Sequence, residues 1–240
     1  MTPEILYEDE HIIVCVKPAG IATQSSRTGT ADMVSILINH IHKNESIKDI
    51  SSKGGIRRSP YLAVLHRLDQ PVEGILVFAK TPLAAKELNR QLTSSEFGKY
   101  YRALLIGAPD IPEDDLTDYL VKDGKTNTSQ ICTADTPGAK LACLHYKISE
   151  SITLESGGQI SIAEITLKTG RHHQIRVQMA NMGCPIVGDR KYNQAGPDPF
   201  GLSLQLFAYH LTFRHPVTKK KMEFEIQRLT HESLRTLYSR

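Results

Sequence analysis

Residues 65–80 read LHRLDQPVEGILVFAK, a short charged loop that runs into an uninterrupted apolar stretch. The apolar part, 74–80, predicts a buried strand. The loop before it carries His66, Arg67 and Asp69. Catalytic groups favour such loops, because rigid strands aim the side chains while the loop keeps them open to substrate. A solvated ion pair between Arg67 and Asp69 is the alternative interpretation of the same pattern.

Around this stretch, hydrophobic periodicity and turn residues predict further strands and helices. Strands are expected at 12–16, 61–65, 99–106, 160–169, 204–213 and 221–226, with a bulge near Ala163-Glu164. Helices are expected at 32–43, from Thr81-Pro82 to Ser94, and from about Ile175 through Met179 and Met182 to Gly183. Loops are expected at 44–59 and 66–73, and short hairpins at 108–140. The absence of a regular βαβα alternation predicts a strand-rich α/β (α+β) domain.

The bulk composition limits the class of protein. With 240 residues and 40% hydrophobic content, the chain can bury a sizeable core, and we expect a single catalytic domain over residues 1–240. The net charge of +3 suits a polyanionic partner through a local patch only. The N-terminus has no signal sequence and no apolar run approaches a membrane span, so we expect a cytoplasmic protein without a membrane partner, and a monomer by default. The separated cysteines predict reduced core thiols at Cys15, Cys132, Cys143 and Cys184.

The segment 169–176, TGRHHQIR, concentrates hydrogen-bond donors at the start of a predicted helix. Arg176 lies three residues after His173 and four after His172, so the spacing predicts that these side chains share one helical face. An arginine that contacts RNA or orients a carboxylate fits this pattern, with a generic phosphate-binding surface as the alternative. Adjacent histidines are expected to point apart and no HxxxH or CxxC accompanies them, so we expect no metal site. Without GxGxxG, GxxxxGK[ST] or a suitable GxSxG, nucleotide-cofactor and serine-hydrolase chemistry lack support.

Five segments resemble, in order, the motifs of the RluA-type pseudouridine synthases, and the likeness covers nearly the whole chain. They are VCVKPAG (14–20), HRLD (66–69) with Gly74, KYYRA (99–103), TGRHHQIR (169–176) and GCPIVGD (183–189). The resemblance implies the pseudouridine synthase fold, a mixed, mostly antiparallel bent sheet flanked by helices and loops. It also implies isomerisation of uridine to pseudouridine in ribosomal or transfer RNA, without a cofactor.

The resemblance also assigns roles to single residues. Asp69 matches the catalytic aspartate, Tyr101 the active-site tyrosine, and Arg176 the arginine that pairs with the aspartate. Arg67 matches the residue that supports the flipped nucleotide or fills the gap it leaves. The RNA-binding surface is then expected to contain His66, Arg67, Arg171, His172, His173, Gln174 and Leu211. Further phosphate contacts are expected from Lys53, Arg57, Arg58, Lys191 and the run 219–221, for which a solvated turn remains equally open.

Five positions depart from the family pattern. They are Val72, Glu73, His172, Gln178 and Phe207, of which Glu73 and His172 are expected to affect which RNA is accepted. The chain also begins almost at its first strand, so we expect no additional N-terminal RNA-binding module. Two other functions remain open: an RNA-binding or chaperone module of the same fold without turnover, and a hydrolase that uses Asp69 to release uracil.

Overall fold

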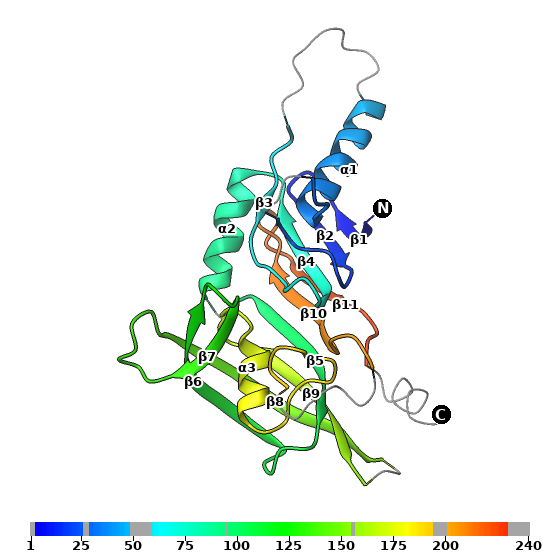
Figure 1. Ribbon diagram of the computed structural model, residues 1–240. Helices are drawn as coiled ribbons and strands as arrows, with labels where there is room; N and C mark the ends of the chain where they lie inside the picture. Colours follow the sequence, from blue (N-terminus) through cyan, green and yellow to red (C-terminus); the bar gives the residue numbers. More distant parts are fainter. Residues whose placement is uncertain are drawn as a thin grey trace. The chain divides into compact units, whose positions relative to one another are not determined.

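The computed structural model describes residues 3–25, 29–48, 59–94, 96–154, 157–193 and 201–229. In this part of the chain the helices are α1 (Met33–Lys48), α2 (Pro82–Thr93) and α3 (Gln174–Asn181) (Figure 1). The strands are β1 (Glu4–Glu8), β2 (Ile12–Lys17), β3 (Ala63–Val64), β4 (Glu73–Ala79), β5 (Gly98–Ile106), β6 (Glu113–Asp123), β7 (Thr128–Cys132), β8 (Lys140–Thr153), β9 (Gln159–Leu167), β10 (Leu206–Arg214) and β11 (Lys221–Glu225). None of the described helices combines the length and the apolar character that a membrane crossing requires. The expected α+β class is confirmed.

The chain divides into two compact units. Unit 1 contains Met1–Phe97 and Leu211–Glu225, and unit 2 contains Gly98–His210 and Ile226–Arg240. The strand order is β1-β2-β4-β10 in unit 1, with β3 beside β4 and β11 beside β10, and β10-β5-β9-β8-β6-β7 in unit 2. Every strand pair whose register is described is antiparallel, as the family resemblance implies. A single domain over residues 1–240 stays a prediction.

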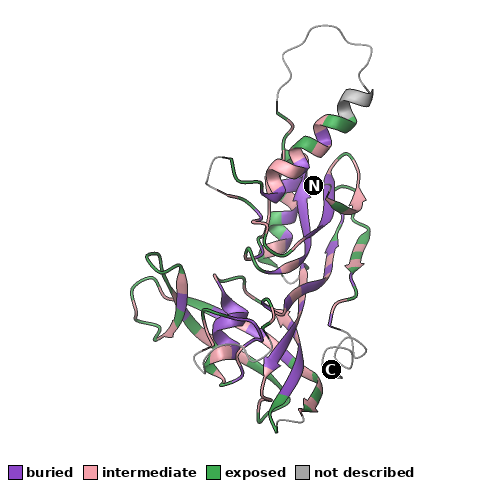
Figure 2. Ribbon diagram, turned by 45° about the vertical axis from the view of Figure 1, so that its right-hand side comes forward, coloured by how far each residue is buried: buried purple, intermediate pink, exposed green. Residues whose placement is uncertain are grey.

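The antiparallel pair of β2 and β4 forms the centre of unit 1. Ile12 pairs with Ala79 and Lys17 pairs with Gly74, and every residue of β2 is buried. Figure 2 shows both strands in the purple of buried residues. Their continuous apolar sequences predicted such fully covered strands. The loop that carries Asp69 is thus attached directly to a rigid strand, because it leads into β4.

The second helix, α2, begins and ends where the sequence predicts. The Thr81 hydroxyl accepts a hydrogen bond from the Ala84 amide at 3.2 Å, and Pro82 occupies the first turn, where its missing N–H costs nothing. The apolar face of the helix, which includes the fully buried Leu88, packs on β4. The helix ends at Thr93, one residue before the predicted end.

The first helix, α1, runs further than the sequence predicts. Asp32 precedes it, and the Asp32 carboxylate accepts a hydrogen bond from the Ser35 amide at 2.8 Å, as an N-cap does. The predicted end at Lys43 is wrong, because the helix continues to Lys48. The expected loop at 44–59 is therefore helical over 44–48. Residues 49–58 lie outside the described residues, and residue 59 is in neither a helix nor a strand.

Unit 2 is built around β9, which pairs with β5 on one side and β8 on the other. The bulge expected near Ala163 occurs at this point of the ladder, but on the partner strand: the register shifts between Ile148 and Glu150 of β8. The predicted short hairpins at 108–140 are one long hairpin of β6 and β7. The sequence analysis did not predict β1 or β8.

All four cysteines lie in the described part of the chain and are free. Cys15 and Cys184 are buried, which confirms the prediction of core thiols for these two, whereas Cys132 and Cys143 are half-buried. Burial raises the pKa of Cys15 to about 12, so this thiol stays protonated and unreactive.

Candidate active site

Asp69 lies in a tight turn between two buried residues of unit 1. The Val72 amide donates to the Asp69 carbonyl at 3.0 Å and closes the turn. Leu68 and Val72 are 7% and 2% exposed, so apolar anchors hold both sides of the turn while Asp69 is only half-buried. The Thr23 hydroxyl accepts from the Leu68 amide and donates to the Leu68 carbonyl, both at 3.1 Å. The backbone that carries the Asp69 carboxylate is therefore held firmly.

A buried ammonium group accompanies this turn. Lys17 is fully buried at the end of β2, and its Nζ donates to three main-chain carbonyls, those of Ile21 at 2.7 Å, Pro18 at 3.0 Å and Gln70 at 3.1 Å. Burial lowers the pKa of Lys17 to about 8, and the negative charges of Asp69 and Glu73 oppose this shift. The Asp69 carboxylate is thus close enough to this ammonium for the two charges to attract each other. The sequence analysis quoted Lys17 within a motif but assigned it no role.

The two residues that precede Leu68 have different surroundings. His66 is half-buried, and its Nε2 accepts a hydrogen bond from the Val77 amide of β4 at 3.3 Å. Its ring also meets Phe97 edge-on, with centroids 5.4 Å apart. These contacts give His66 a structural role that the sequence did not reveal. Arg67 is exposed, and RNA contacts for both residues stay predictions.

In unit 2, an unusual backbone conformation precedes α3. His173 is left-handed, with φ 54°, and the helix begins only at Gln174. The expected helical face shared by His172, His173 and Arg176 is therefore wrong. The two histidine rings do not point apart either: they stack with centroids 3.8 Å apart, because the left-handed residue interrupts the normal side-chain alternation. Within the described residues, no group of three or more His, Cys, Asp or Glu side chains could hold a metal ion.

Arg176 forms a bidentate ion pair with Asp189. Its Nε donates to Oδ2 and its Nη2 to Oδ1, each at 2.7 Å, and the two side chains are 5% and 0% exposed. Asp189 also accepts hydrogen bonds from the amides of Lys191 at 2.9 Å and Tyr192 at 3.3 Å. Nothing in the sequence paired these two side chains, although Asp189 ends the GCPIVGD segment. The expected pairing of Arg176 with Asp69 would join the two units and stays a prediction.

The residue before Asp189 must be glycine. Gly188 has φ +77°, a conformation that residues with a Cβ rarely adopt. A Cβ at this position would collide with the Ser203 carbonyl oxygen. The absence of a side chain therefore lets two backbone segments approach beside the carboxylate that binds Arg176.

Hydrogen bonds connect the start of α3 to the β6–β7 hairpin. The Tyr192 hydroxyl accepts from the Ser129 amide at 2.8 Å and lies 2.6 Å from His173 Nδ1. The Ser129 hydroxyl lies 2.8 Å from His172 Nδ1. Burial lowers the pKa of His173 to about 3, and the positive charge of Arg176 adds to this effect. His173 is therefore neutral, so its Nδ1 can accept a hydrogen bond from the Tyr192 hydroxyl.

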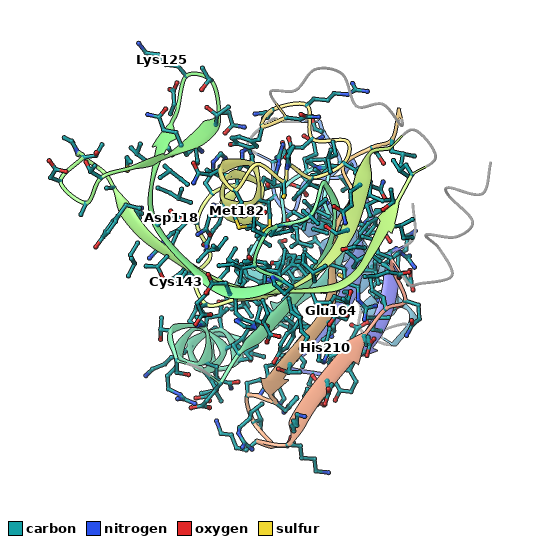
Figure 3. The ribbon with its side chains drawn as sticks, turned by 90° about the horizontal axis from the view of Figure 1, so that it is seen from below. Asp118, Lys125, Cys143, Glu164, Met182 and His210 are labelled. Carbon is teal, nitrogen blue, oxygen red and sulfur yellow. The ribbon has the colours of Figure 1, made fainter. Side chains whose placement is uncertain are left out.

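Gln174 organises the turn before α3 from inside the protein. It is 2% exposed, and its Oε1 accepts from the Thr169 hydroxyl at 2.8 Å and the Arg171 amide at 3.0 Å. Its Nε2 donates to Gln178, which in turn donates to Asp118 of β6 at 2.7 Å. Figure 3 labels Asp118 on this strand. Gln178, one of the departures from the family pattern, thus ties α3 to β6, while RNA binding by Gln174 stays a prediction.

Tyr101 and Leu211 are both core residues of their own units. Tyr101 is 7% exposed on β5 opposite Ile165, and Leu211 is 2% exposed on β10. Phe207, another departure from the family pattern, packs against a buried apolar cluster of unit 2 that includes Leu104. The catalytic role of Tyr101 stays a prediction.

The lysine run at 219–221 behaves mostly as a solvated turn. Lys219 pairs with Glu87 at 3.2 Å, and Lys221 pairs with Glu223 at 2.7 Å. These charges are already compensated, which favours the alternative that the sequence analysis left open. Lys53, Arg57 and Arg58, the other expected phosphate contacts of unit 1, lie outside the described residues.

Comparison with known proteins supplies the family. The sequence pattern of the RNA pseudouridylate synthase family matches residues 11–181, most of the chain. This chain belongs to the RNA pseudouridylate synthase family. The predicted relationship to RluA-type synthases is confirmed, and with it the class of activity, that of an isomerase acting on RNA.

Several curated relatives of this RNA pseudouridylate synthase have names that describe a substrate. The Dual-specificity RNA pseudouridine synthase RluA of Salmonella typhimurium is 34% identical, and the alignment covers 92% of this chain and 91% of the relative. The Ribosomal large subunit pseudouridine synthase D of Zymomonas mobilis is 30% identical, over 93% of this chain and 68% of the relative. A solved human structure, RNA Pseudouridylate Synthase Domain Containing 1, matches with a TM-score of 0.74 over 99% of this chain and 88% of its own, at 20% identity. This last similarity concerns the fold alone.

Proposed function

We propose that this chain isomerises uridine to pseudouridine in RNA, with Asp69 as the reacting carboxylate. The observation that carries the proposal is the placement of Asp69 in a half-buried turn, held by Leu68 and Val72, beside the buried ammonium of Lys17. A rigid backbone and a nearby positive charge keep a carboxylate ionised and aimed. Membership of the RNA pseudouridylate synthase family supplies the substrate class.

The reaction needs a carboxylate but no redox partner. The bond from ribose C1′ to uracil N1 breaks, the base turns, and a bond from C1′ to C5 forms, so the product is an isomer of the substrate. The proton lost from C5 is balanced by the one gained at N1. Asp69 can act as a nucleophile or as a base on the sugar, and both roles require its ionised form. We propose that the chain works without a small-molecule cofactor.

The other site residues have proposed roles that follow the family resemblance. Arg176 would pair with Asp69, while Asp189 holds the guanidinium from its other side. Tyr101 would contact the uracil through its ring or hydroxyl. The target uridine must leave its stack, at a cost of roughly a few kcal/mol, and the exposed Arg67 would stabilise the gap. Leu211 would pack near the base.

The substrate is proposed to be ribosomal or transfer RNA. By their names, one of the relatives above acts on the ribosomal large subunit and the other is an RNA pseudouridine synthase of dual specificity. His66, His172 and Arg171 complete the proposed RNA-binding surface. The buried His173 and Gln174 are proposed to support it from within the protein. We also propose a monomer that acts in the cytoplasm.

The test is a comparison of Asp69→Asn with the wild type. RNA from cells that lack the gene is incubated with each protein, digested to nucleosides and separated by chromatography. The wild type is expected to form pseudouridine, and Asp69→Asn none, with unchanged circular dichroism. Asp110→Asn, which alters an exposed aspartate, is the matched control and is expected to act as the wild type. Pseudouridine from Asp69→Asn would refute the role of Asp69, and free uracil would indicate a hydrolase.

An RNA-binding module without turnover makes a different prediction. In a strain that lacks the gene, the wild type and Asp69→Asn would then restore growth equally, and neither would form pseudouridine. The proposed function expects restoration of the modified nucleotide by the wild type alone. Mapping pseudouridines in the two strains also identifies the RNA and the position.

A further inference from the structure

Two positive side chains meet beside the turn that precedes α3. Lys99 is the second residue of β5, and a Cβ on Gly170 would lie 3.6 Å from the Lys99 Nζ. The lysine amine therefore lies against the backbone of the residue next to Arg171. Lys99, Gly170 and Arg171 all belong to unit 2.

Arg171 is held in place by main-chain and side-chain contacts. Its amide donates to Gln174 Oε1 at 3.0 Å, and its Nε donates to the Leu141 carbonyl at 2.7 Å. The turn itself is fastened to β8, because the Thr169 amide donates to the Cys143 carbonyl at 3.0 Å; Figure 3 labels Cys143. The two terminal nitrogens of the exposed guanidinium have no acceptor among the described residues. They are therefore oriented and available.

Neither cation has an acidic partner in the described part of the chain. Burial lowers the pKa of Lys99, and the positive charge of Arg171 lowers it further. Nearby Lys168, in contrast, pairs with Asp115 at 2.8 Å. Two like charges without an acid between them cost stability, and arrangements that cost stability are concentrated at sites of function. An anion at this place would turn the repulsion into attraction.

We propose that Lys99 and Arg171 bind one phosphate group of the RNA backbone. Two guanidinium nitrogens match two phosphate oxygens, and the ammonium adds a point charge from the side of β5. Lys99 shares a face of the strand with Tyr101, two residues and about 7 Å further on. A nucleotide whose phosphate lies at Lys99 could therefore present its base to Tyr101. The inference rests on the proposed function, because it takes RNA as the polyanion.

The experiment measures RNA binding by the full chain as a function of salt. Total RNA from cells that lack the gene is fragmented, labelled with fluorescein and titrated with protein at KCl concentrations from about 0.05 to 0.3 M. Lys99→Met is expected to bind roughly tenfold more weakly than the wild type at low salt. The slope of log affinity against log salt is expected to become shallower by about 0.7 to 1, the value of one lost phosphate contact. Lys99→Arg is expected to keep most of the affinity and the slope.

Stability distinguishes a binding lysine from a structural one. Because the Lys99 charge is unfavourable in the free protein, Lys99→Met is expected to unfold at the same or higher urea concentration than the wild type. The matched control is Lys147→Met, because Lys147 is exposed and pairs with Glu113 at 2.9 Å. This variant is expected to have the affinity and the salt slope of the wild type. A Lys99→Met protein with the wild-type slope would overturn the proposal. So would one that loses stability together with affinity, because Lys99 would then serve the fold.

The binding assay requires no turnover, so it separates this inference from the proposed function. If the wild type forms no pseudouridine while Lys99→Met still shows the shallower slope, the proposed isomerisation fails and the phosphate site stands. If pseudouridine forms normally and Lys99→Met changes neither the affinity nor the slope, the phosphate site fails and the isomerisation stands.

Discussion

Arg176 and Asp189 bind each other through two parallel hydrogen bonds of 2.7 Å, with almost no exposure of either side chain. The geometry fixes the plane of the guanidinium, because two of its nitrogens, Nε and Nη2, bind the two oxygens of one carboxylate. An arginine proposed to pair with a catalytic carboxylate is thus positioned by a second carboxylate thirteen residues later. The precision of the site then depends on a residue that has no proposed contact with the substrate.

Removal of this second carboxylate is expected to destabilise the protein strongly. Asp189→Ala leaves the buried Arg176 guanidinium without its bidentate partner, a type of change that costs about 3–5 kcal/mol of unfolding free energy. Urea unfolding at neutral pH measures this value. Glu113→Ala, which breaks an exposed pair with Lys147, is the control and is expected to change the unfolding free energy little. Similar losses in both variants would contradict the importance of burial.

A series of glycine substitutions separates conformational strain from steric collision. At Gly124 an added Cβ has no atom within 4 Å and the backbone is not left-handed, so Gly124→Ala is expected to be neutral or slightly stabilising. At Gly183 an added Cβ also has no atom within 4 Å, but φ is +79°. Gly183→Ala is therefore expected to cost about 1–2 kcal/mol of unfolding free energy from backbone strain alone. Gly188→Ala adds the collision with the Ser203 carbonyl and is expected to cost clearly more than Gly183→Ala. Thermal unfolding of the three variants would disprove this explanation if Gly183 and Gly188 gave equal losses.

The elements that the sequence predicted correctly are those with local signals. The β-branched run of β2 and the Thr81-Pro82 start of α2 need no information from elsewhere in the chain. The sequence analysis missed β8, although Ala142, Leu144 and Tyr146 alternate as buried residues along it. His145 and Lys147, at the alternate positions, interrupt the apolar pattern of the segment. That alternation was the signal that could have identified the strand.

The site could be predicted as motifs but not as contacts. The resemblance indicated Asp69, Tyr101 and Arg176 because each lies in a recognisable segment. Contacts between distant segments, such as Arg176 with Asp189 or Ser129 with His172, leave no local pattern. The stacked histidines were predicted wrongly for the same reason, since a left-handed backbone at a non-glycine residue depends on its tertiary surroundings.

The buried lysine beside the Asp69 turn is expected to affect stability at alkaline pH. The pKa of Lys17 is about 8 in the folded protein and about 10.4 in an unfolded chain, so between these values the unfolded state holds more protons. The unfolding free energy of the wild type, relative to Lys17→Met, should then rise with pH from 8 to 10.4, by at most about 1.4 kcal/mol per pH unit. Below pH 8 the difference should be constant. A difference that stays flat to pH 10.4 would show that the pKa of Lys17 is not lowered.

The neutral histidine before α3 gives a dependence of the same sign, but in acid: the unfolding free energy again rises with pH. The pKa of His173 is about 3 in the folded protein and about 6.5 in an unfolded chain, so the unfolded state takes up a proton first as the pH falls. The wild type should therefore lose stability between pH 6.5 and 3, by at most about 1.4 kcal/mol per pH unit from this group. His173→Asn is the suitable comparison, because asparagine tolerates the left-handed φ of 54° and does not titrate.

Urea unfolding of both proteins at several pH values from about 7 to 4 isolates the contribution of this histidine, since all other acid-labile groups are shared. At pH 7 the wild type is expected to be the more stable protein, because it keeps the hydrogen bond between His173 and Tyr192. This advantage should shrink steadily below pH 6.5. If the two proteins lose stability in parallel, the pKa of His173 is not lowered by folding. The assignment of neutral His173 as the hydrogen-bond acceptor of the Tyr192 hydroxyl is then incorrect.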